Sequence, residues 1–477
     1  MNSGWLEKVS NFVKSTKTFA VTNPADGTHV ADVADLGAAE TTSAIAVAKA
    51  AMPAWAAKTA KERANILRAW FNLIMENQEK LAHLLTLEQG KPLAEAMGEI
   101  AYGASFIEWF AEEGKRLYGD VIPSHGSDKR ILVLKQPIGV VAAITPWNFP
   151  NAMITRKVGP ALAAGCTALV KPGEDTPLSA LALAMLAEEA GLPAGVLTII
   201  PTKDAAPVAK AFTDSSDVRK LSFTGSTRVG KLLMKQCADT VKKVSLELGG
   251  NAPFIVFDDA DLDAAVVGAM MSKYRNAGQT CVCANRILVQ ASVMEAFSAK
   301  LKVAVEALSV GNGMTSGVTT GPLINAAAVA KVHGLVEKAL ADGAEAIIGG
   351  DRHELGGNFY QPTILAGVTP DMDIAHEEIF GPVAPLFSFE DEAEAIRMAN
   401  DTPYGLAAYF YSRDVGRIWR VSEALEYGIV GINEGIISTE VAPFGGVKEA
   451  GIGREGSKYG IDDYVEMKYL CMGGLST

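Results

Sequence analysis

Cys281 is the residue of this sequence with the clearest potential for chemistry. It lies in the stretch Gly278-Gln279-Thr280-Cys281-Val282-Cys283, between a helix-like segment, Leu262 to Asn276, and a strand-like one, Asn285 to Gln290. A cysteine acts as a nucleophile only as the thiolate, so it needs nearby donors or positive charge. Arg275 and the backbone of the glycine-containing turn could supply both. The alternative is a buried structural cysteine, the more common fate of this residue type.

Two further stretches could support a cysteine that attacks a carbonyl carbon. This chemistry needs a donor for the oxyanion and, if the product is an acid, a base that activates water. Asn148 lies between two prolines at a predicted strand end and offers an amide donor, and Glu247 is a lone carboxylate among apolar neighbours. Burial would raise the pKa of Glu247 towards the range of a general base. Taken singly, each residue is equally compatible with an ordinary turn or surface strand position.

A phosphate-binding loop is predicted at Phe223 to Gly230, where a strand ends, glycine allows a tight turn and a helix begins. Helix N-termini bind anions. The stretch does not match G-x-G-x-x-G. It nearly matches the G-x4-G-K-[ST] loop of nucleoside triphosphatases, but Leu232 follows Lys231, so no hydroxyl is available for magnesium. A triphosphatase is therefore the weaker interpretation, and a plain strand-to-helix turn is the alternative.

Lys171-Pro172-Gly173-Glu174 ends an earlier strand of the same predicted sheet. The Glu174 carboxylate could accept both hydroxyls of an adenosine ribose, as acidic residues do in dinucleotide sites. A solvated ion pair in a loop is the alternative.

The elements that must position these residues alternate along the chain. From Gly139 to Gly250, five strand-like segments alternate with four helix-like ones, and a second α/β region begins near Asn251. Such alternation indicates βαβ units and parallel sheets, which bind ligands at the carboxyl ends of their strands. We therefore predict an α/β fold.

Other segments are predicted to serve as scaffold. Helical spacing of apolar residues predicts helices at Thr41 to Ala57, Lys61 to Asn77 and Gln78 to Gln89. Ile131 to Gln136 is predicted to be a strand of an inserted hairpin. The C-terminal segment Asp463 to Leu470 alternates like an edge strand, and such strands often pair with another subunit.

Composition excludes several classes of protein. The 477 residues carry a formal net charge of −12 and no basic cluster, which disfavours nucleic acid as a partner. The longest nearly apolar run, Leu178 to Ala187, is too short to span a bilayer, and no signal peptide is evident, so we expect a cytoplasmic location. Five cysteines and six scattered histidines predict neither a disulfide framework nor a metal site.

Seven ordered motifs together resemble the aldehyde dehydrogenase superfamily over nearly the whole chain. They are PWNFP (146–150), KPGE (171–174), FTGSTRVG (223–230), LELGG (246–250), GQTC (278–281), EEIFGPV (377–383) and PFGGVK (443–448). The resemblance implies two Rossmann-like α/β domains and a small β oligomerisation element. It implies a cofactor-binding domain of residues 1–117 and 139–249, a catalytic domain of residues 250–449, and an oligomerisation element of residues 118–138 and 450–477. A homo-dimer or homo-tetramer is expected.

The resemblance also implies a nicotinamide-dependent oxidation. Cys281 would be the nucleophile and Glu247 the general base, while Asn148 and the Cys281 backbone amide would stabilise the oxyanion. The thiolate would add to the aldehyde, hydride would pass to the cofactor, and Glu247 would activate water to hydrolyse the thioester. The residues expected to hold the cofactor are Trp147, Lys171, Glu174, Gly225, Ser226, Glu378 and Phe380.

Within the superfamily the chain is most similar to succinate-semialdehyde dehydrogenases, through residues 154–157, 274–283 and 433–438. This similarity implies that Arg156, Arg275 and Ser438 bind the far carboxylate of a semialdehyde, because arginine bonds a carboxylate with two parallel donors. The alternative is that one arginine forms a structural ion pair. The same motifs fit glutarate-semialdehyde dehydrogenases, since one methylene contributes only about 1–3 kcal/mol of discrimination.

Three further expectations concern the cofactor, the second cysteine and the reaction type. Glu174 would repel a 2′-phosphate, so NAD is expected in preference to NADP. Cys283 could form a disulfide with Cys281 under oxidation and switch the enzyme off, although it could equally be an inert neighbour. A coenzyme A-acylating enzyme or a non-catalytic relative is an alternative to hydrolysis, but the presence of Glu247 favours hydrolysis.

Overall fold

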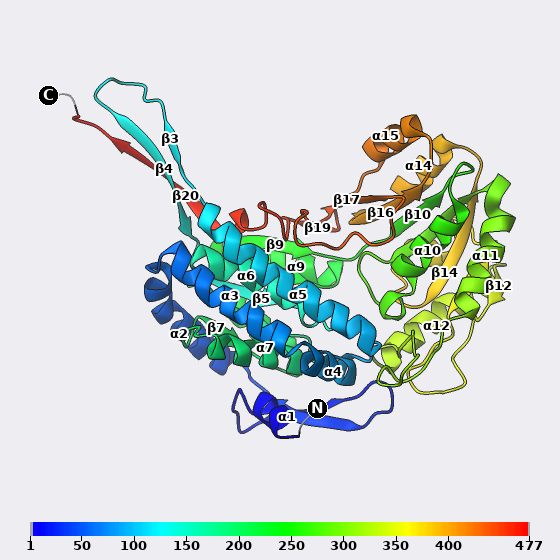
Figure 1. The fold of residues 1–477 in the computed structure, drawn as a ribbon, viewed down its shortest axis with the longest axis horizontal. Helices are drawn as coiled ribbons and strands as arrows, with labels where there is room; N and C mark the ends of the chain where they lie inside the picture. The colour runs from blue at the N-terminus through cyan, green and yellow to red at the C-terminus, as the bar shows by residue number, and fades with distance from the viewer. Residues whose placement is uncertain (1–2, 476–477) are drawn as a thin grey trace.

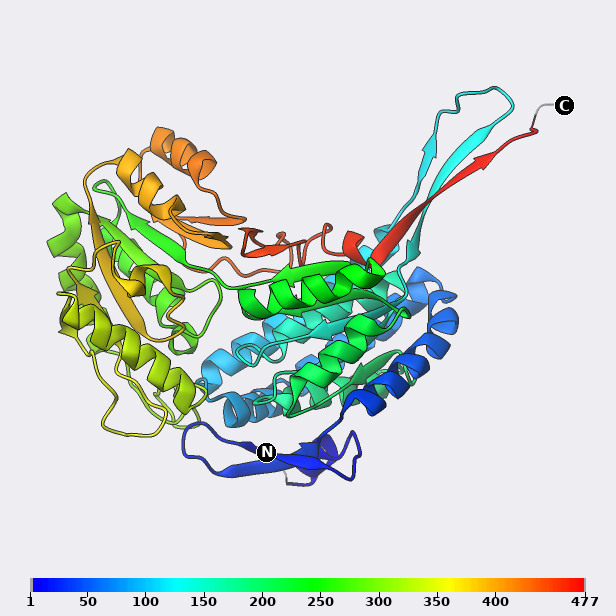
Figure 2. The ribbon, with the colours of Figure 1, turned by 180° about the vertical axis from the view of Figure 1, so that it is seen from behind.

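The structure is a computed structural model that describes residues 3–475. Two α/β domains lie side by side, and a narrow three-stranded arm projects from the first of them (Figure 1). Figure 2, seen from behind, shows the same arm, in which the last strand of the chain runs towards the tip. The predicted α/β class is confirmed.

A six-stranded sheet forms the centre of the first domain. The strand order is β19-β9-β8-β5-β6-β7, with all neighbours parallel except β19, which pairs antiparallel with β9. The strands are β5 (Val140–Ile144), β6 (Thr167–Lys171), β7 (Leu197–Ile199), β8 (Val218–Thr224), β9 (Lys243–Glu247) and β19 (Gly451–Ile452).

Helices cover both faces of this sheet because both faces of its strands are apolar. Alternate residues of β5 join different cores: Val141 and Ala143 pack on one side, and Val140 and Ala142 on the other. The first side is covered by α3 (Ala60–Glu76), α4 (Gln78–Gln89), α5 (Leu93–Glu113), α6 (Ala152–Ala164) and α7 (Pro177–Glu189). The second is covered by α2 (Ala38–Ala56), α8 (Ala205–Asp214) and α9 (Thr227–Cys237).

The N-terminal region contains more structure than the sequence predicts. The helix predicted at Gln78 to Gln89 is confirmed, and α2 begins three residues earlier than predicted. Helix α1 (Ser3–Ser10), the hairpin of β1 (Thr18–Thr22) and β2 (His29–Ala34), and the long helix α5 were not predicted. Glycines weaken the helical signal of α5. One of them, Gly103, is needed because a Cβ there would lie 2.1 Å from the Asn151 side chain.

The second domain is built on a seven-stranded sheet of order β12-β13-β14-β11-β10-β16-β17, parallel except for β12. Its strands are β10 (Ala252–Val256), β11 (Ala284–Gln290), β12 (Glu345–Ile348), β13 (Thr363–Ala366), β14 (Val383–Phe389), β16 (Ala407–Tyr411) and β17 (Ile429–Ile432). Its helices are α10 (Leu262–Lys273), α11 (Met294–Glu306), α12 (Ala326–Ala341), α13 (Asp373–His376), α14 (Glu392–Asn400) and α15 (Val415–Ala424). A two-stranded ribbon, β15 (Tyr404–Gly405) with β18 (Val447–Lys448), lies beyond it.

The helix predicted up to Asn276 is too long at its C-terminal end. Helix α10 ends at Lys273, and a short 3-10 segment, η3 (Arg275–Gly278), follows. Within it Asn276, Ala277 and Gly278 have φ values of 52°, 53° and 75°. Left-handed conformations are strained for residues other than glycine and persist only where the surroundings impose them. The chain therefore leaves the helix through a constrained turn just before Cys281.

The arm consists of β3 (Asp120–Ile122), β4 (Arg130–Pro137) and β20 (Val465–Met472), with β4 in the middle. The predicted strand at 131–136 is confirmed, and its partners join it from both sides. The predicted terminal edge strand is also confirmed, but it begins at Val465 because Asp462–Tyr464 form a 3-10 turn. The assignment of the domain boundaries stays a prediction.

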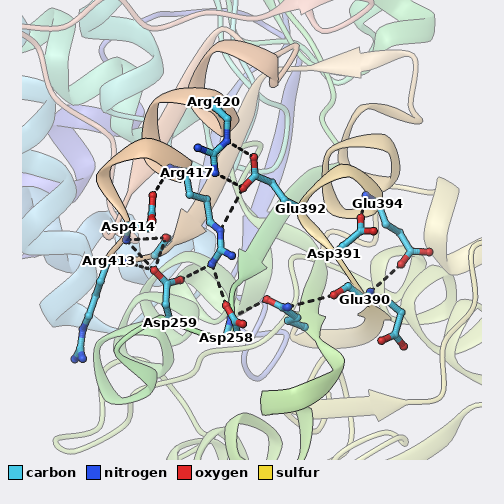
Figure 3. Close-up of polar contacts among 12 residues, drawn as sticks. Asp258, Asp259, Glu390, Asp391, Glu392, Glu394, Arg413, Asp414, Arg417 and Arg420 are labelled. Carbon is cyan, nitrogen blue, oxygen red and sulfur yellow. Dashed lines mark hydrogen bonds and ion pairs between the residues drawn. The ribbon is translucent and has the colours of Figure 1, made fainter.

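An ionic network fastens the outer helices of the second domain to its sheet (Figure 3). Arg417 of α15 lies 2.7 Å from Asp259, which follows β10, and 3.3 Å from Glu392 of α14. The Asp259 carboxylate also accepts hydrogen bonds of 2.8 Å from Ser412 Oγ and from the Arg413 and Asp414 amides. One carboxylate therefore joins three segments.

Candidate active site

The predicted site residues gather where strands of the first sheet end. A cavity of about 290 Å³ is lined by Asn148 beyond β5, Gly225 beyond β8 and Glu247 at the end of β9. The second domain contributes Cys281 and Glu378 to the same cavity. The expected location at the carboxyl ends of parallel strands is thus found.

Cys281 lines both this cavity and a second one of about 20 Å³, as Met153 does. Close approaches demand glycine around it: a Cβ at Gly278 would lie 2.1 Å from Gly381 O, and one at Gly250 would lie 2.8 Å from Cys281 O. Burial raises the pKa of the thiol to about 12, and the Arg156 guanidinium opposes this more strongly than Arg275 does. Arg156, and not Arg275 as expected, is therefore the principal positive charge acting on the thiol.

Asn148 is buried beside the cysteine loop. Its Nδ2 donates to the carbonyl oxygen of Gln279, two residues before Cys281, at 3.0 Å. An amide nitrogen carries two hydrogens, so one remains for an oxyanion. The carbonyl oxygen of Asn148 itself accepts from Asn276 Nδ2 at 3.0 Å.

Glu247 is buried, and its Oε2 has no hydrogen-bond partner among the described residues. Burial and the neighbouring Glu455 carboxylate raise the pKa of Glu247 well above its ordinary value, while Arg156 and Lys157 oppose the shift. A carboxyl group in this condition exchanges protons nearer neutral pH, which a general base requires.

Glu455 is a site residue that the sequence analysis missed. It forms ion pairs with Arg156 and Lys157, and the Lys157 Nζ to Glu455 Oε1 distance is 2.5 Å. Lys157 Nζ also donates to Ser222 Oγ at 3.1 Å. Glu455 lies 298 residues from Lys157 along the chain, so no local pattern could have identified it. Arg156 therefore takes part in a buried ion pair, the alternative considered for one of the two arginines.

The smaller cavity brings together the three residues expected at the substrate tail, Arg156, Arg275 and Ser438. Tyr102 and Thr280 also line it and were not predicted. Four donor groups in this cavity have no hydrogen-bond partner among the described residues: Arg156 Nη2, Arg275 Nε, Tyr102 Oη and Thr280 Oγ1. Buried donors normally find acceptors, so this arrangement suits an anionic group. The volume is that of about one water molecule, so a larger ligand must displace side chains.

Most of the residues expected at the cofactor line the larger cavity: Trp147, Gly225, Ser226, Glu378 and Phe380. The Trp147 and Phe380 rings meet edge to face with centroids 5.6 Å apart. Ser226 caps α9 by accepting from the Val229 amide at 3.4 Å. Glu378 accepts from the Gly250 amide at 3.2 Å, and burial raises its pKa to about 7.

Lys171 and Glu174 do not line this cavity. Lys171 is the last residue of β6, the neighbour of β5, and Glu174 lies in the following loop. The two form an ion pair with an Nζ to Oε2 distance of 2.8 Å. The loop lies against Trp147, because a Cβ at Gly173 would lie 2.9 Å from the Trp147 amide nitrogen. The Glu174 side chain is 45% exposed, so its carboxylate is available to a ligand at the rim.

Cys283 is buried, and its Sγ lies 3.4 Å from the Lys273 carbonyl oxygen. Burial raises the pKa of its thiol, an effect that Lys273 opposes. Cys281 and Cys283 are both free thiols in this structure.

Two kinds of feature are absent from residues 3–475. No helix in that range is long and apolar enough to cross a membrane. No group of three or more His, Cys, Asp or Glu side chains there is arranged to hold a metal ion.

Comparison with known proteins identifies the family. The model of the aldehyde dehydrogenase family matches residues 12–470. The chain is 63% identical over 473 residues to GabD of Escherichia coli (strain K12), named as an NADP(+) succinate-semialdehyde dehydrogenase, with 99% of this chain and 97% of that protein covered. It is 63% identical over 459 residues to a glutarate-semialdehyde dehydrogenase of Pseudomonas aeruginosa, covering 96% and 95% of the two chains.

A solved structure agrees with this similarity. The succinate-semialdehyde dehydrogenase of Burkholderia pseudomallei superimposes with a TM-score of 0.95 at 64% identity, covering 96% of this chain and 95% of that one. The fold of this chain is therefore that of an aldehyde dehydrogenase. Family match, relatives and fold agree, and the chain belongs to the aldehyde dehydrogenase family of oxidoreductases.

Proposed function

We propose that this enzyme oxidises a short semialdehyde to the dicarboxylic acid, with succinate semialdehyde favoured over glutarate semialdehyde and NAD favoured over NADP. The observation that carries the proposal is the position of Cys281 between two cavities. One cavity is large enough for part of a nucleotide cofactor. The other presents donor atoms without hydrogen-bond partners to the tail of a substrate, among them Arg156 Nη2 and Arg275 Nε.

The residues of the larger cavity fit a nicotinamide cofactor, which would accept the hydride when bound. The backbone at its rim is uncrowded only because glycine is present: a Cβ at Gly225 would lie 2.5 Å from the Phe223 ring. Trp147, Ser226, Glu378 and Phe380 are proposed to hold the group at this surface, with Lys171 and Glu174 at the rim.

The groups of the chain account for the steps at the aldehyde carbon. Cys281 Sγ, after losing its proton, bonds to that carbon, and the carbonyl oxygen becomes an oxyanion. The unused Asn148 Nδ2 hydrogen and the Cys281 amide are proposed to stabilise it. After the thioester has formed, Glu247 takes a proton from water, the hydroxide attacks the thioester carbon, and the acid leaves as the thiol is restored.

The tail site is tested by replacing Arg275 with leucine. We expect the KM for succinate semialdehyde to rise about 100-fold, since a bidentate charged hydrogen bond is lost, and the KM for hexanal to change little. Steady-state kinetics with both aldehydes measure this. Equal losses for the charged and the uncharged aldehyde would contradict the assignment.

The cofactor preference is tested on the wild type and on Glu174→Gln. The negative charge of Glu174 should disfavour a 2′-phosphate, so kcat/KM should be higher with NAD than with NADP, and the variant should narrow the difference. The Escherichia coli relative is named for NADP(+), which makes this comparison decisive. A wild type that prefers NADP would contradict the proposal.

Two alternative activities are tested together. NADH absorbance with an aldehyde panel, with and without coenzyme A, separates hydrolysis from acyl transfer and from a non-catalytic relative. Glu247 supports hydrolysis, because acyl transfer does not need a base that activates water.

We also propose that the protein acts in the cytoplasm as a homo-dimer or homo-tetramer, and that Cys283 can form an inactivating disulfide with Cys281.

A further inference from the structure

A buried ion pair lies behind the turn that carries Asn148. Lys91 precedes α5 and Glu99 lies within it, and the Lys91 Nζ to Glu99 Oε2 distance is 2.6 Å. Each side chain is only 1% exposed. Burying two charges is unfavourable unless both make further good hydrogen bonds, so the other partners of this pair indicate what it does.

The two residues hold opposite ends of the Asn148 turn. Lys91 Nζ donates to the carbonyl oxygen of Asn148 at 2.8 Å. Glu99 Oε1 accepts from the backbone amides of Asn151 at 2.9 Å and Ala152 at 3.3 Å, where α6 begins. The ring between these points, Phe149, has its centroid 3.8 Å from Lys91 Nζ. A single ion pair thus fixes both ends and the middle of the turn.

The carbonyl oxygen of Asn148 also ties this turn to residues 276–281, the segment that carries Cys281. Asn276 Nδ2 donates to the carbonyl oxygens of both Asn148 and Gln279, at 3.0 and 3.2 Å. The backbone amide of Asn276, a residue in the left-handed conformation, donates to Glu95 Oε2 at 2.8 Å. Glu95 lies one helical turn before Glu99 on α5. The start of α5 therefore supports both sides of the reaction centre.

We propose that Lys91 and Glu99 are positioning residues of the active site, which orient the Asn148 amide towards the oxyanion on the Cys281 adduct. The proposal rests on the proposed role of Asn148 as an oxyanion donor. Neither residue lines either cavity at Cys281. They act through the backbone of residues 148–152, where a displacement of about 1 Å is expected to reduce the rate about 100-fold.

The test uses Lys91→Met and the neutral double variant Lys91→Met with Glu99→Gln. The double variant leaves no lone buried charge and keeps an acceptor for the start of α6, but it lacks the hydrogen bond to Asn148. We expect it to reduce the single-turnover rate of NADH formation about 100-fold, with the aldehyde KM within about threefold of wild type. As a control, Lys300→Met with Asp263→Asn removes an exposed ion pair and should change neither the single-turnover rate nor the aldehyde KM.

A double-mutant cycle with Asn148→Ala identifies the route of the effect. In the Asn148→Ala background, Lys91→Met with Glu99→Gln should not lower the single-turnover rate further, because the side chain through which Lys91 and Glu99 act has been removed. A full additional 100-fold loss, or a wild-type rate for the folded double variant, would overturn the proposal. If Asn148→Ala alone kept the wild-type rate, the oxyanion role in the proposed function would fail, and the positioning role with it. Thermal melting shows which variants fold. If Lys91→Met alone does not fold, the test is made with the double variant Lys91→Met with Glu99→Gln.

Discussion

At the scale of single residues, burial raises the pKa of both reactive groups of the reaction centre. Burial keeps the Cys281 thiol protonated at neutral pH and raises the pKa of the Glu247 carboxyl group as well. The Cys281 thiolate therefore forms only when a ligand changes the surroundings of the thiol. The Arg156 guanidinium is the largest opposing influence on the thiol.

The raised pKa of Glu247 predicts how turnover depends on pH. A base with a raised pKa is still protonated at mildly acidic pH, so kcat should fall as pH drops through that pKa. Glu455→Gln removes a neighbouring negative charge, which should lower the pKa of Glu247 and move the acidic limb of the kcat profile to lower pH. Glu449→Gln, which alters only an exposed pair with Lys231, is the control. If the acidic limb of the kcat profile did not move in Glu455→Gln, the influence of Glu455 on the pKa of Glu247 would be contradicted.

Local motifs predict some of these residues and not others. Asn148, Glu247 and Cys281 each lie in a short stretch whose neighbours suggest a turn, a strand end or a nucleophile, so the motifs taken together predict them as site residues. Glu455 and Tyr102 have no such context, because they reach the site only through long-range packing. Burial decides their importance, and burial is a property of the assembled fold.

At the scale of elements, fully buried parallel strands explain why most of the fold could be predicted. Strand β5 alternates between two cores, which gives an uninterrupted apolar run with turn residues at each end. Element ends are harder to predict. Helix α10 stops at Lys273 because the following turn is fixed by contacts with α5, such as the Asn276 amide with Glu95, and these are invisible in the local sequence.

The network around Asp259 predicts an effect on stability. Partial burial opposes ionisation, but hydrogen bonds from Ser412 and from the Asp414 amide hold the pKa of Asp259 below its ordinary value. A lowered carboxyl pKa stabilises the fold above the unfolded pKa, and the contribution disappears as pH falls through the folded pKa. Asp259→Asn should therefore lower the free energy of unfolding by about 1–2 kcal/mol at pH 7 and progressively less below about pH 4.

Urea unfolding at several pH values measures this difference, and Asp263→Asn is the matched control. Asp263 pairs with Lys300 at 2.5 Å, but its side chain is 82% exposed, so its replacement should change the unfolding free energy by less than about 0.5 kcal/mol. Equal effects of the two substitutions would show that the hydrogen bonds to Asp259 do not contribute to the free energy of unfolding. An effect independent of pH would contradict the role of its charge.

At the scale of the whole molecule, the arm is the part expected to need a second copy of the chain. Both faces of β20 are exposed beyond Val465, and no helix covers them in Figure 1. Val121 and Met467 are 80% and 75% exposed. A three-stranded sheet needs a packed apolar face for stability, and exposed apolar patches mark interaction surfaces. The arm of the proposed homo-oligomer is therefore expected to be covered by a second copy of the chain.

Charge placed on the arm tests this expectation without touching the active site. The double variant Val121→Asp with Met467→Asp should shift the protein from dimer or tetramer to monomer in sedimentation velocity, because two carboxylates would be buried at the interface. Val415→Asp is the control, since Val415 is 69% exposed at the first turn of α15, where an acidic residue suits the helix dipole. If the arm variant kept the wild-type mass at micromolar concentration, the interface would have to lie elsewhere on the molecule. If it became monomeric and also lost activity, the tail and cofactor sites would depend on assembly.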